Sequence, residues 1–126
     1  MPYLLILLLL VTGCASGGGR SDEAANVGPI DYKADLLAFL RTYLNDPTNV
    51  REAMIAEPQQ RAVGPDQRWT ACLRYNARDT VGNYSGIRER LAVYYRGRFD
   101  RLVENARESC KDAAYAPFPE LERLKR

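Results

Sequence analysis

The sequence predicts a single α+β domain in which one amphipathic helix packs on an antiparallel sheet. Apolar residues recur at helical spacing over residues 31–45, whereas polar and apolar residues alternate over 67–77 and 87–96. A pair of cysteines can bridge the sheet to the segment that follows it. Because the chain has 126 residues, it has room for only one domain, which we place at 29–126.

Residues 31–45, DYKADLLAFLRTYLN, form the clearest predicted helix. Its apolar stripe consists of Leu36, Leu37, Leu40, Tyr43 and Leu44. Asp31 is a suitable N-cap, and Asn45 followed by Asp46-Pro47 ends the helix. The stripe is wide enough to need a partner surface, for which we expect a sheet.

Four segments are candidates for a three- or four-stranded antiparallel meander. Residues 67–77 alternate, with Trp69, Ala71, Leu73 and Tyr75 on one face and Cys72 on the other. Residues 87–96 alternate again, with Ile87, Leu91, Val93 and Tyr95 on one face. A tight turn at Gly97 leads into residues 98–104. Residues 50–57, closed by Pro58, are a weaker candidate that also suits a helix.

The segment after the sheet is predicted to be a short helix followed by an extended strap. Residues 105–114 suit the helix, and the sequence Tyr115-Ala116-Pro117-Phe118-Pro119 suits the strap because prolines disfavour regular helix. We expect this strap to lie on the back of the sheet.

Cys72 and Cys110 are predicted to form a structural disulfide. An even pair in an exported chain is more often bridged than free. The alternative is a redox or metal site, but no Cys-x-x-Cys occurs and the chain has no histidine to join the thiols. The bridge would draw the segment after the last strand onto the back of the sheet.

The amino terminus predicts export. Residues 3–11, YLLILLLLV, are an unbroken apolar run that is too short to span a membrane, which needs about 20 residues. No Lys or Arg precedes the run, so either the true start lies upstream or export is inefficient. Residues 15–28 are rich in Gly, Ser and Ala and predict a flexible tether within the segment 14–28.

The sequence Val11-Thr12-Gly13-Cys14 resembles the lipobox of bacterial lipoproteins. This resemblance implies that residues 1–13 are removed by signal peptidase II and that the Cys14 thiol carries a diacylglyceryl group, with a further acyl chain such as palmitate on the new amino group. Two or more acyl chains anchor a protein stably. Ala15 after the cysteine, by resemblance to enteric sorting, implies the outer membrane with the domain facing the periplasm. The alternative is an ordinary signal peptide with Cys14 incidental.

Composition excludes several classes of function. Histidine, the commonest general base and a common zinc ligand, is absent, and we expect neither a metal nor another cofactor. The formal charge is only +2 and the basic residues are dispersed, which argues against nucleic-acid binding. Carboxylate pairs such as Glu104 with Glu108, or Glu120 with Glu122, are interpreted as solvated surface rather than as an acid and a base.

An arginine-rich face is the candidate binding surface. If the strands pair, several outward side chains would share one face and could bind an anionic partner through bidentate contacts. They are Arg68, Arg74, Arg88, Arg90 and Arg96, together with Tyr94. The alternative is that these side chains only solvate the back of the sheet or stack under the 115–118 strap.

Three stretches resemble small uncharacterised lipoproteins of Gram-negative bacteria. They are Tyr32-Lys33-Ala34-Asp35, Cys72-Leu73-Arg74-Tyr75-Asn76-Ala77 and Tyr115-Ala116-Pro117-Phe118-Pro119-Glu120-Leu121. The resemblance implies no activity. We therefore expect a lipid-anchored envelope protein with a non-catalytic binding, structural or assembly role. The alternative is an envelope hydrolase or transferase that uses carboxylates alone.

Overall fold

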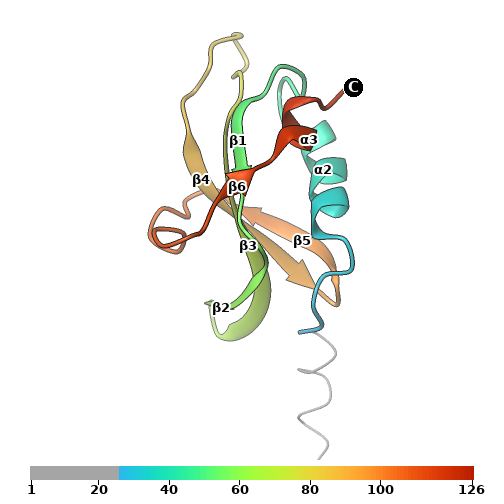
Figure 1. Cartoon of the computed structure of the whole chain (residues 1–126), viewed down its shortest axis with the longest axis vertical. Helices are drawn as coiled ribbons and strands as arrows, with labels where there is room; N and C mark the ends of the chain where they lie inside the picture. The colour runs from blue at the N-terminus through green and yellow to red at the C-terminus, as the bar shows by residue number, and fades with distance from the viewer. Residues whose placement is uncertain (1–25) are drawn as a thin grey trace, which may run out of the picture.

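The computed structural model describes residues 26–126, which form a six-stranded antiparallel sheet with two helices (Figure 1). In chain order the elements are α2 (Tyr32–Tyr43), β1 (Arg51–Ile55), β2 (Gln59–Val63), β3 (Asp66–Asn76), β4 (Arg88–Tyr95), β5 (Arg98–Val103), β6 (Ala116–Pro117) and α3 (Pro119–Glu122). The predicted α+β class is confirmed, whereas the predicted number of strands, three or four, is too low. The expected signal peptide, the lipobox and most of the tether lie outside the described residues.

The strand β3 is the centre of the sheet. The strand order is β5-β4-β3-β1-β6, and β2 pairs with the first half of β3 on the same side as β1. Thus β1 and β2 follow one another along one edge of β3, and the break between them contains Pro58. Because proline has no N–H to donate, it interrupts a ladder. Strand β2 was not predicted, because Pro58 is typical of the end of a strand segment.

Two tight turns set the register of the hairpins. Gly64, with φ of 59°, and Pro65 join β2 to β3, since Val63 pairs with Asp66. Arg96 and Gly97, with φ of 53° and 79°, join β4 to β5. Two positive φ values are the signature of a type I′ turn, whose twist suits an antiparallel hairpin. The predicted tight turn at Gly97 is confirmed.

The helix α2 covers one face of the sheet. Asp31 caps it by accepting a hydrogen bond from the Ala34 backbone N–H at 3.1 Å, as predicted. Leu36 and Leu40 are fully buried, but Tyr43, predicted for the same stripe, is 45% exposed. The aromatic residue of α2 that contacts β5 is instead Phe39, whose ring centroid lies 4.6 Å from that of Phe99.

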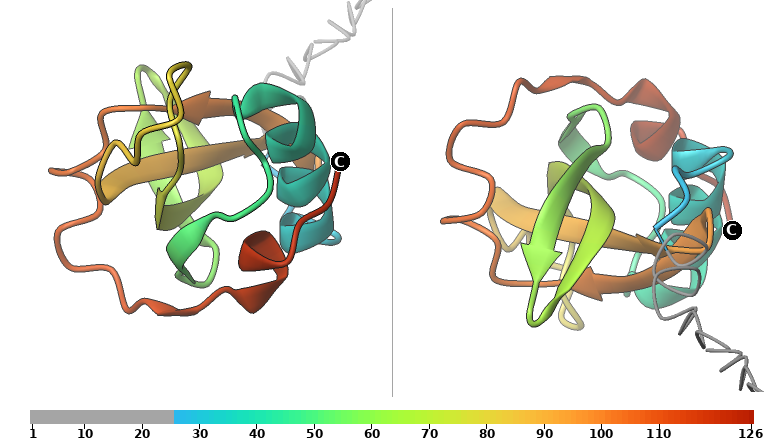
Figure 2. Two further views of the ribbon diagram at one scale, coloured as in Figure 1. Left: turned by 90° about the horizontal axis from the view of Figure 1, so that it is seen from above. Right: turned by 90° about the horizontal axis from the view of Figure 1, so that it is seen from below.

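Both faces of the sheet are buried, each under different cover. On one face, α2, α3 and Phe118 enclose the larger core with residues of β1, β3 and β4. On the other, the segment 104–115 covers a smaller cluster of Ala56, Cys72, Leu91, Val93, Ala106 and Cys110. Figure 2 shows this segment and the helices on opposite sides of the sheet. None of the helices in residues 26–126 has the length and hydropathy to cross a membrane.

Two predictions about these faces need correction. Tyr94, predicted to point outward, is 1% exposed in the larger core, and its hydroxyl donates to the Tyr32 carbonyl at 2.7 Å. Because both faces of β4 are buried, its apolar residues are contiguous and alternation gives no direction. Residues 105–114 form turns, not the predicted short helix.

The predicted disulfide between Cys72 and Cys110 is confirmed. Their Cα atoms are 5.8 Å apart, and both residues are 1% exposed. The bond fixes the segment 104–115 to the centre of β3. After it, β6 pairs with β1 in an extended conformation, so the predicted strap lies at the edge of the sheet beside β1.

Candidate functional site

A polar pocket of about 520 Å³ lies where α2 ends. We call it the arginine–tyrosine pocket. Its lining comes from the end of α2, from β3 and β4, from the loop 77–87 and from the end of β5; the side chains used below are Tyr43, Tyr75, Arg78, Arg88, Arg90 and Glu104. The end of α2 and the loop 77–87 lie in the upper part of Figure 1, at the end of the domain opposite to the β4–β5 turn.

Tyr75 forms the floor of the pocket. Its side chain is fully buried, and its hydroxyl has no hydrogen-bond partner within residues 26–126. The guanidinium of Arg90 lies over its ring, 3.9 Å from the centroid. Burial raises the pKa of Tyr75 well above its ordinary value of 10.0, with the Arg90 charge opposing this in part. The hydroxyl therefore stays protonated near neutral pH, but it is buried and has no acceptor within residues 26–126.

Glu104 fixes Arg90 in this position. The Arg90 Nε donates to the carboxylate at 2.9 Å, and Tyr43 at the end of α2 donates its hydroxyl to the same carboxylate. That hydrogen bond is the main reason that the pKa of Tyr43 is raised. Arg90 also donates to the Arg88 carbonyl at 3.1 Å. These contacts hold the guanidinium over the Tyr75 ring.

Two further arginines line the pocket. Arg78 forms an ion pair with Asp46 at 3.7 Å, and hydrogen bonds from Thr48 hold the pKa of Asp46 below its ordinary value. Arg88 is exposed and forms no ion pair within residues 26–126. The Arg88 guanidinium is therefore available to pair with an anionic ligand.

The loop 77–87 is ordered by its own side chains. The Asp79 carboxylate accepts the backbone N–H groups of Val81 and Asn83, each at 3.0 Å. Ser85 donates its hydroxyl to the Ala77 carbonyl at 2.9 Å. Asx and Ser turns of this kind fix a loop without regular structure, so the wall of the pocket is built before any ligand arrives.

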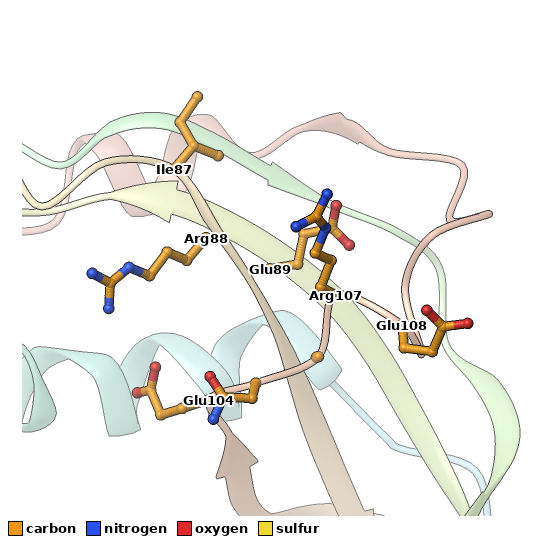
Figure 3. Close-up of a pocket in the computed structure, with 8 residues that line it drawn as sticks. Ile87, Arg88, Glu89, Glu104, Arg107 and Glu108 are labelled. Carbon is orange, nitrogen blue, oxygen red and sulfur yellow. The ribbon is translucent and has the colours of Figure 1, made fainter.

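A second hollow of about 460 Å³ adjoins the pocket and shares Arg88 and Glu104 with it. Figure 3 shows Arg88 and Glu89 leaving β4 on opposite sides. Ile87 at its rim is 52% exposed, and the remaining lining comes from residues 104–108. Glu104 and Glu108, considered above as an acid–base pair, both line it, but each already has a partner: Arg90 for Glu104 and Lys111, at 3.1 Å, for Glu108.

The structure divides the predicted arginine face between two faces of the sheet. Residues directly opposite each other on neighbouring strands share a face. Arg88 pairs with Tyr75 and Arg90 with Leu73, so these two arginines lie on the side of the larger core. Arg68 and Arg74 lie on the disulfide side, and Arg96 is in the β4–β5 turn. The expectation of one shared face is therefore wrong. Arg88 and Arg90 were predicted on the same face as Arg68 and Arg74, but the pairing of β4 with β3 places them on the other face.

Arg74 follows the alternative interpretation. Its guanidinium lies 4.4 Å from the centroid of the Tyr115 ring, so it stacks under the strap. Burial, and then the Glu89 carboxylate, raise the pKa of Tyr115 to about 12. This cluster closes the rim of the disulfide-side core and leaves Arg74 unavailable to an outside partner.

The arginine–tyrosine pocket has the chemistry of an anion site. Its charged side chains are three arginines and two carboxylates, Asp79 and Glu104. The buried Tyr75 adds a hydroxyl that has no hydrogen-bond partner within residues 26–126. Guanidinium groups bind carboxylate or phosphate in a bidentate manner. Sequence reasoning proposed Arg88 and Arg90 but missed Tyr75 as a functional residue, because its side chain was assigned only to the core. The cross-strand pairing of Tyr75 with Arg88 was the missing information.

The comparisons with known proteins give no family for this chain. No protein-family model, no curated protein and no solved structure matches it. Within residues 26–126, no group of three or more His, Cys, Asp or Glu side chains is arranged to hold a metal ion.

Proposed function

We propose that this protein is a lipid-anchored protein of the bacterial envelope that binds an anionic partner and catalyses no reaction. The observation that carries the location is the Cys72–Cys110 disulfide, buried at 1% exposure on both sides. Disulfides persist in oxidising compartments and are rare in the cytosol. Together with the lipobox sequence around Cys14, it favours export, lipid on that cysteine and a domain facing the periplasm. Ala15 after the cysteine favours the outer membrane as the anchoring membrane.

The binding role is supported by the arginine–tyrosine pocket and by what surrounds it. Exposed apolar side chains lie at the same end of the domain, namely Tyr43, Val81 and Ile87. Arginine and aromatic side chains are enriched at the centres of protein interfaces. We propose that a carboxylate or phosphate group of an envelope partner binds to the exposed Arg88 at the mouth of the pocket, and that the exposed apolar residues contact the rest of the partner.

A non-catalytic role is favoured over a carboxylate-dependent hydrolase because the pocket carboxylate is already engaged. Glu104 accepts hydrogen bonds from both Arg90 and Tyr43, so it is committed to holding the arginine. No histidine is available as a general base. A hydrolase would need Glu104 to accept or donate a proton, whereas here its carboxylate holds Arg90 in place in the pocket.

Anchoring is tested with Cys14→Ser. We expect this variant to lose metabolic lipid labelling and to leave the membrane fraction, whereas a Ser16→Ala variant, altered two residues away, keeps both. Unchanged membrane fractionation of Cys14→Ser would contradict the proposal, and so would an unmodified cysteine in the mature wild-type protein.

Binding is tested by cross-linking in intact cells followed by mass spectrometry. Losing one charge-assisted hydrogen bond costs about 1.5–3 kcal/mol, so Arg88→Glu should weaken capture of the partner roughly tenfold or more. Arg101→Glu is the matched control, since Arg101 is an exposed arginine of β5 outside the pocket. Equal capture by both variants would contradict the site, and turnover of a cell-wall substrate by the purified protein would favour the enzyme.

A further inference from the structure

The chain enters the fold beside the β4–β5 turn. The Trp69 indole N–H donates to the Asn26 carbonyl at 3.0 Å, and the Ile30 N–H donates to the Gly97 carbonyl at 3.1 Å. Residues 26–28, expected in the tether, are thus already attached to the sheet. Only residues 15–25 separate Cys14 from this point, and a chain of that length reaches at most about 40 Å even when fully extended.

Exposed apolar and aromatic side chains surround this entry point. Ile30 is 83% exposed, and Val27 and Tyr95 are also exposed. We call Val27, Ile30, Tyr95 and Arg96 the tether-end patch. The Tyr95 ring lies near two guanidinium groups, since Arg68 and Arg96 are 5.3 and 5.4 Å from its centroid.

Two carboxylates at this end are engaged by other arginines, whereas Glu57, which lines a hollow with Ile30 and Trp69, forms no ion pair within residues 26–126. Asp35 binds Arg98 through both oxygens, at 2.6 and 3.0 Å, and Asp66 lies 3.5 Å from Arg68. Within residues 26–126, Arg96 forms no ion pair. The tether-end patch therefore combines an apolar rim with a free positive charge.

The backbone at Arg96 also needs an explanation. A type I′ turn requires positive φ at both central residues and favours Asn, Asp or Gly there, yet the first position holds arginine with φ of 53°. A residue in a sparsely populated conformation suggests a role for its side chain. Here the turn places Arg96 at the tip of the hairpin, next to Gly97, whose carbonyl accepts the hydrogen bond from Ile30.

We infer that the tether-end patch lies against the surface of the membrane that holds the lipid on Cys14. This rests on the proposed function, because it requires the anchor. Phosphate groups of anionic phospholipids accept hydrogen bonds from Arg96, while Ile30, Val27 and Tyr95 enter the interfacial region, where aromatic and basic residues are enriched in membrane proteins. The short tether makes the bilayer the surface that this end of the domain meets most often.

The test uses the full lipidated protein, labelled with ¹⁵N, in nanodiscs of phosphatidylethanolamine and phosphatidylglycerol that contain a gadolinium-chelating lipid. Paramagnetic broadening reports how near each amide is to the headgroups. We expect the amides of Ile30 and Gly97 to broaden several-fold more than those of Val81 and Gly82 at the opposite end. Replacing phosphatidylglycerol by phosphatidylcholine should reduce the difference.

An Ile30→Glu/Arg96→Glu variant should remove most of the difference, because it replaces the apolar and basic contacts by negative charge. Val81→Glu is the matched control, as Val81 is 76% exposed at the other end, and it should leave the pattern unchanged. Equal broadening at both ends of the wild type, or a pattern unaffected by the double variant, would overturn the inference. A missing anchor is recognised separately, since the protein then lacks the lipid mass and does not float with the discs.

Discussion

Removal of the disulfide is the sharpest test of how the fold is held together. Cys72 and Cys110 are 38 residues apart in sequence. In the chain-entropy model, closing a loop of that length stabilises the folded state by about 4 kcal/mol at 25 °C. For a domain of this size each kcal/mol lowers Tm by about 4 °C or more, so loss of the bond should lower Tm by about 15 °C or more.

The assay is thermal unfolding of the protein purified from cells in detergent, followed by far-ultraviolet circular dichroism. The variant is Cys72→Ala/Cys110→Ala, which leaves Cys14 unchanged. A reductant should lower the Tm of the wild type toward that of the variant and should not affect the variant. A variant that unfolds within about 3 °C of the oxidised wild type would refute the reasoning, since such a shift corresponds to less than about 1 kcal/mol.

The loop should also respond locally. Besides the bond, Ala106, Ala113 and Tyr115 of the segment 104–115 pack on the disulfide-side core. Hydrogen bonds also attach the segment, from Arg90 to Glu104 at 2.9 Å and from Arg61 to the Ser109 carbonyl at 2.8 Å. The Ala106 N–H donates to the Glu89 carbonyl at 3.3 Å, a long hydrogen bond. In the double variant we expect this amide to exchange with solvent much faster than amides of β3. Equal protection of the Ala106 amide in both proteins would mean that the contacts other than the disulfide are enough to order the segment.

Three further predictions concern titratable side chains. Tyr75→Phe should raise Tm by several degrees because it removes a buried hydroxyl without a partner, whereas Tyr94→Phe should lower Tm because it breaks the hydrogen bond to Tyr32. Above pH 10 the free energy of unfolding should fall, because tyrosines ionise near pH 10.0 in the unfolded chain while burial raises the pKa of Tyr75 and Tyr94 in the folded protein. Tyr75→Phe should reduce the slope of the free energy of unfolding against pH by about 1.4 kcal/mol per pH unit, as measured by urea unfolding. Arg98 lowers the pKa of Asp35 below 3.8, so Asp35→Asn should reduce Tm at pH 7, and the difference from wild type should vanish as the pH falls below that value; a constant difference would contradict the pair.

The helix, the α+β class and the disulfide could be predicted because their signals are local or combinatorial. The apolar spacing in 31–45 and the Asp31 cap lie within one element, and only two cysteines remain once Cys14 is assigned to lipid. The disulfide could therefore be predicted from the number of cysteines, without knowledge of the structure. The direction of β4 could not be predicted in the same way. Its sequence from Leu91 to Tyr95 is contiguous in apolar residues because both faces of the sheet are covered, so alternation has no meaning there.

The pocket depends on register, which the sequence does not display. Tyr43, Tyr75, Arg90 and Glu104 come from four elements or their ends, and the pairing of β3 with β4 brings Tyr75 beside Arg88. A shift of one residue would move every side chain of β4 to the other face. Type and spacing of residues therefore indicated arginines of interest without indicating which of them meet.

The two proposed sites lie at opposite ends of α2. The helix begins beside Ile30, next to the tether-end patch, and ends at Tyr43, which lines the arginine–tyrosine pocket. Its 12 residues span about 18 Å, more than the Debye length of about 8 Å at physiological ionic strength. A membrane that contacts the patch is thus too distant to compete electrostatically for the pocket, which faces away from it. Arg96 and Arg88 then serve different partners, and evidence against either proposal leaves the other standing.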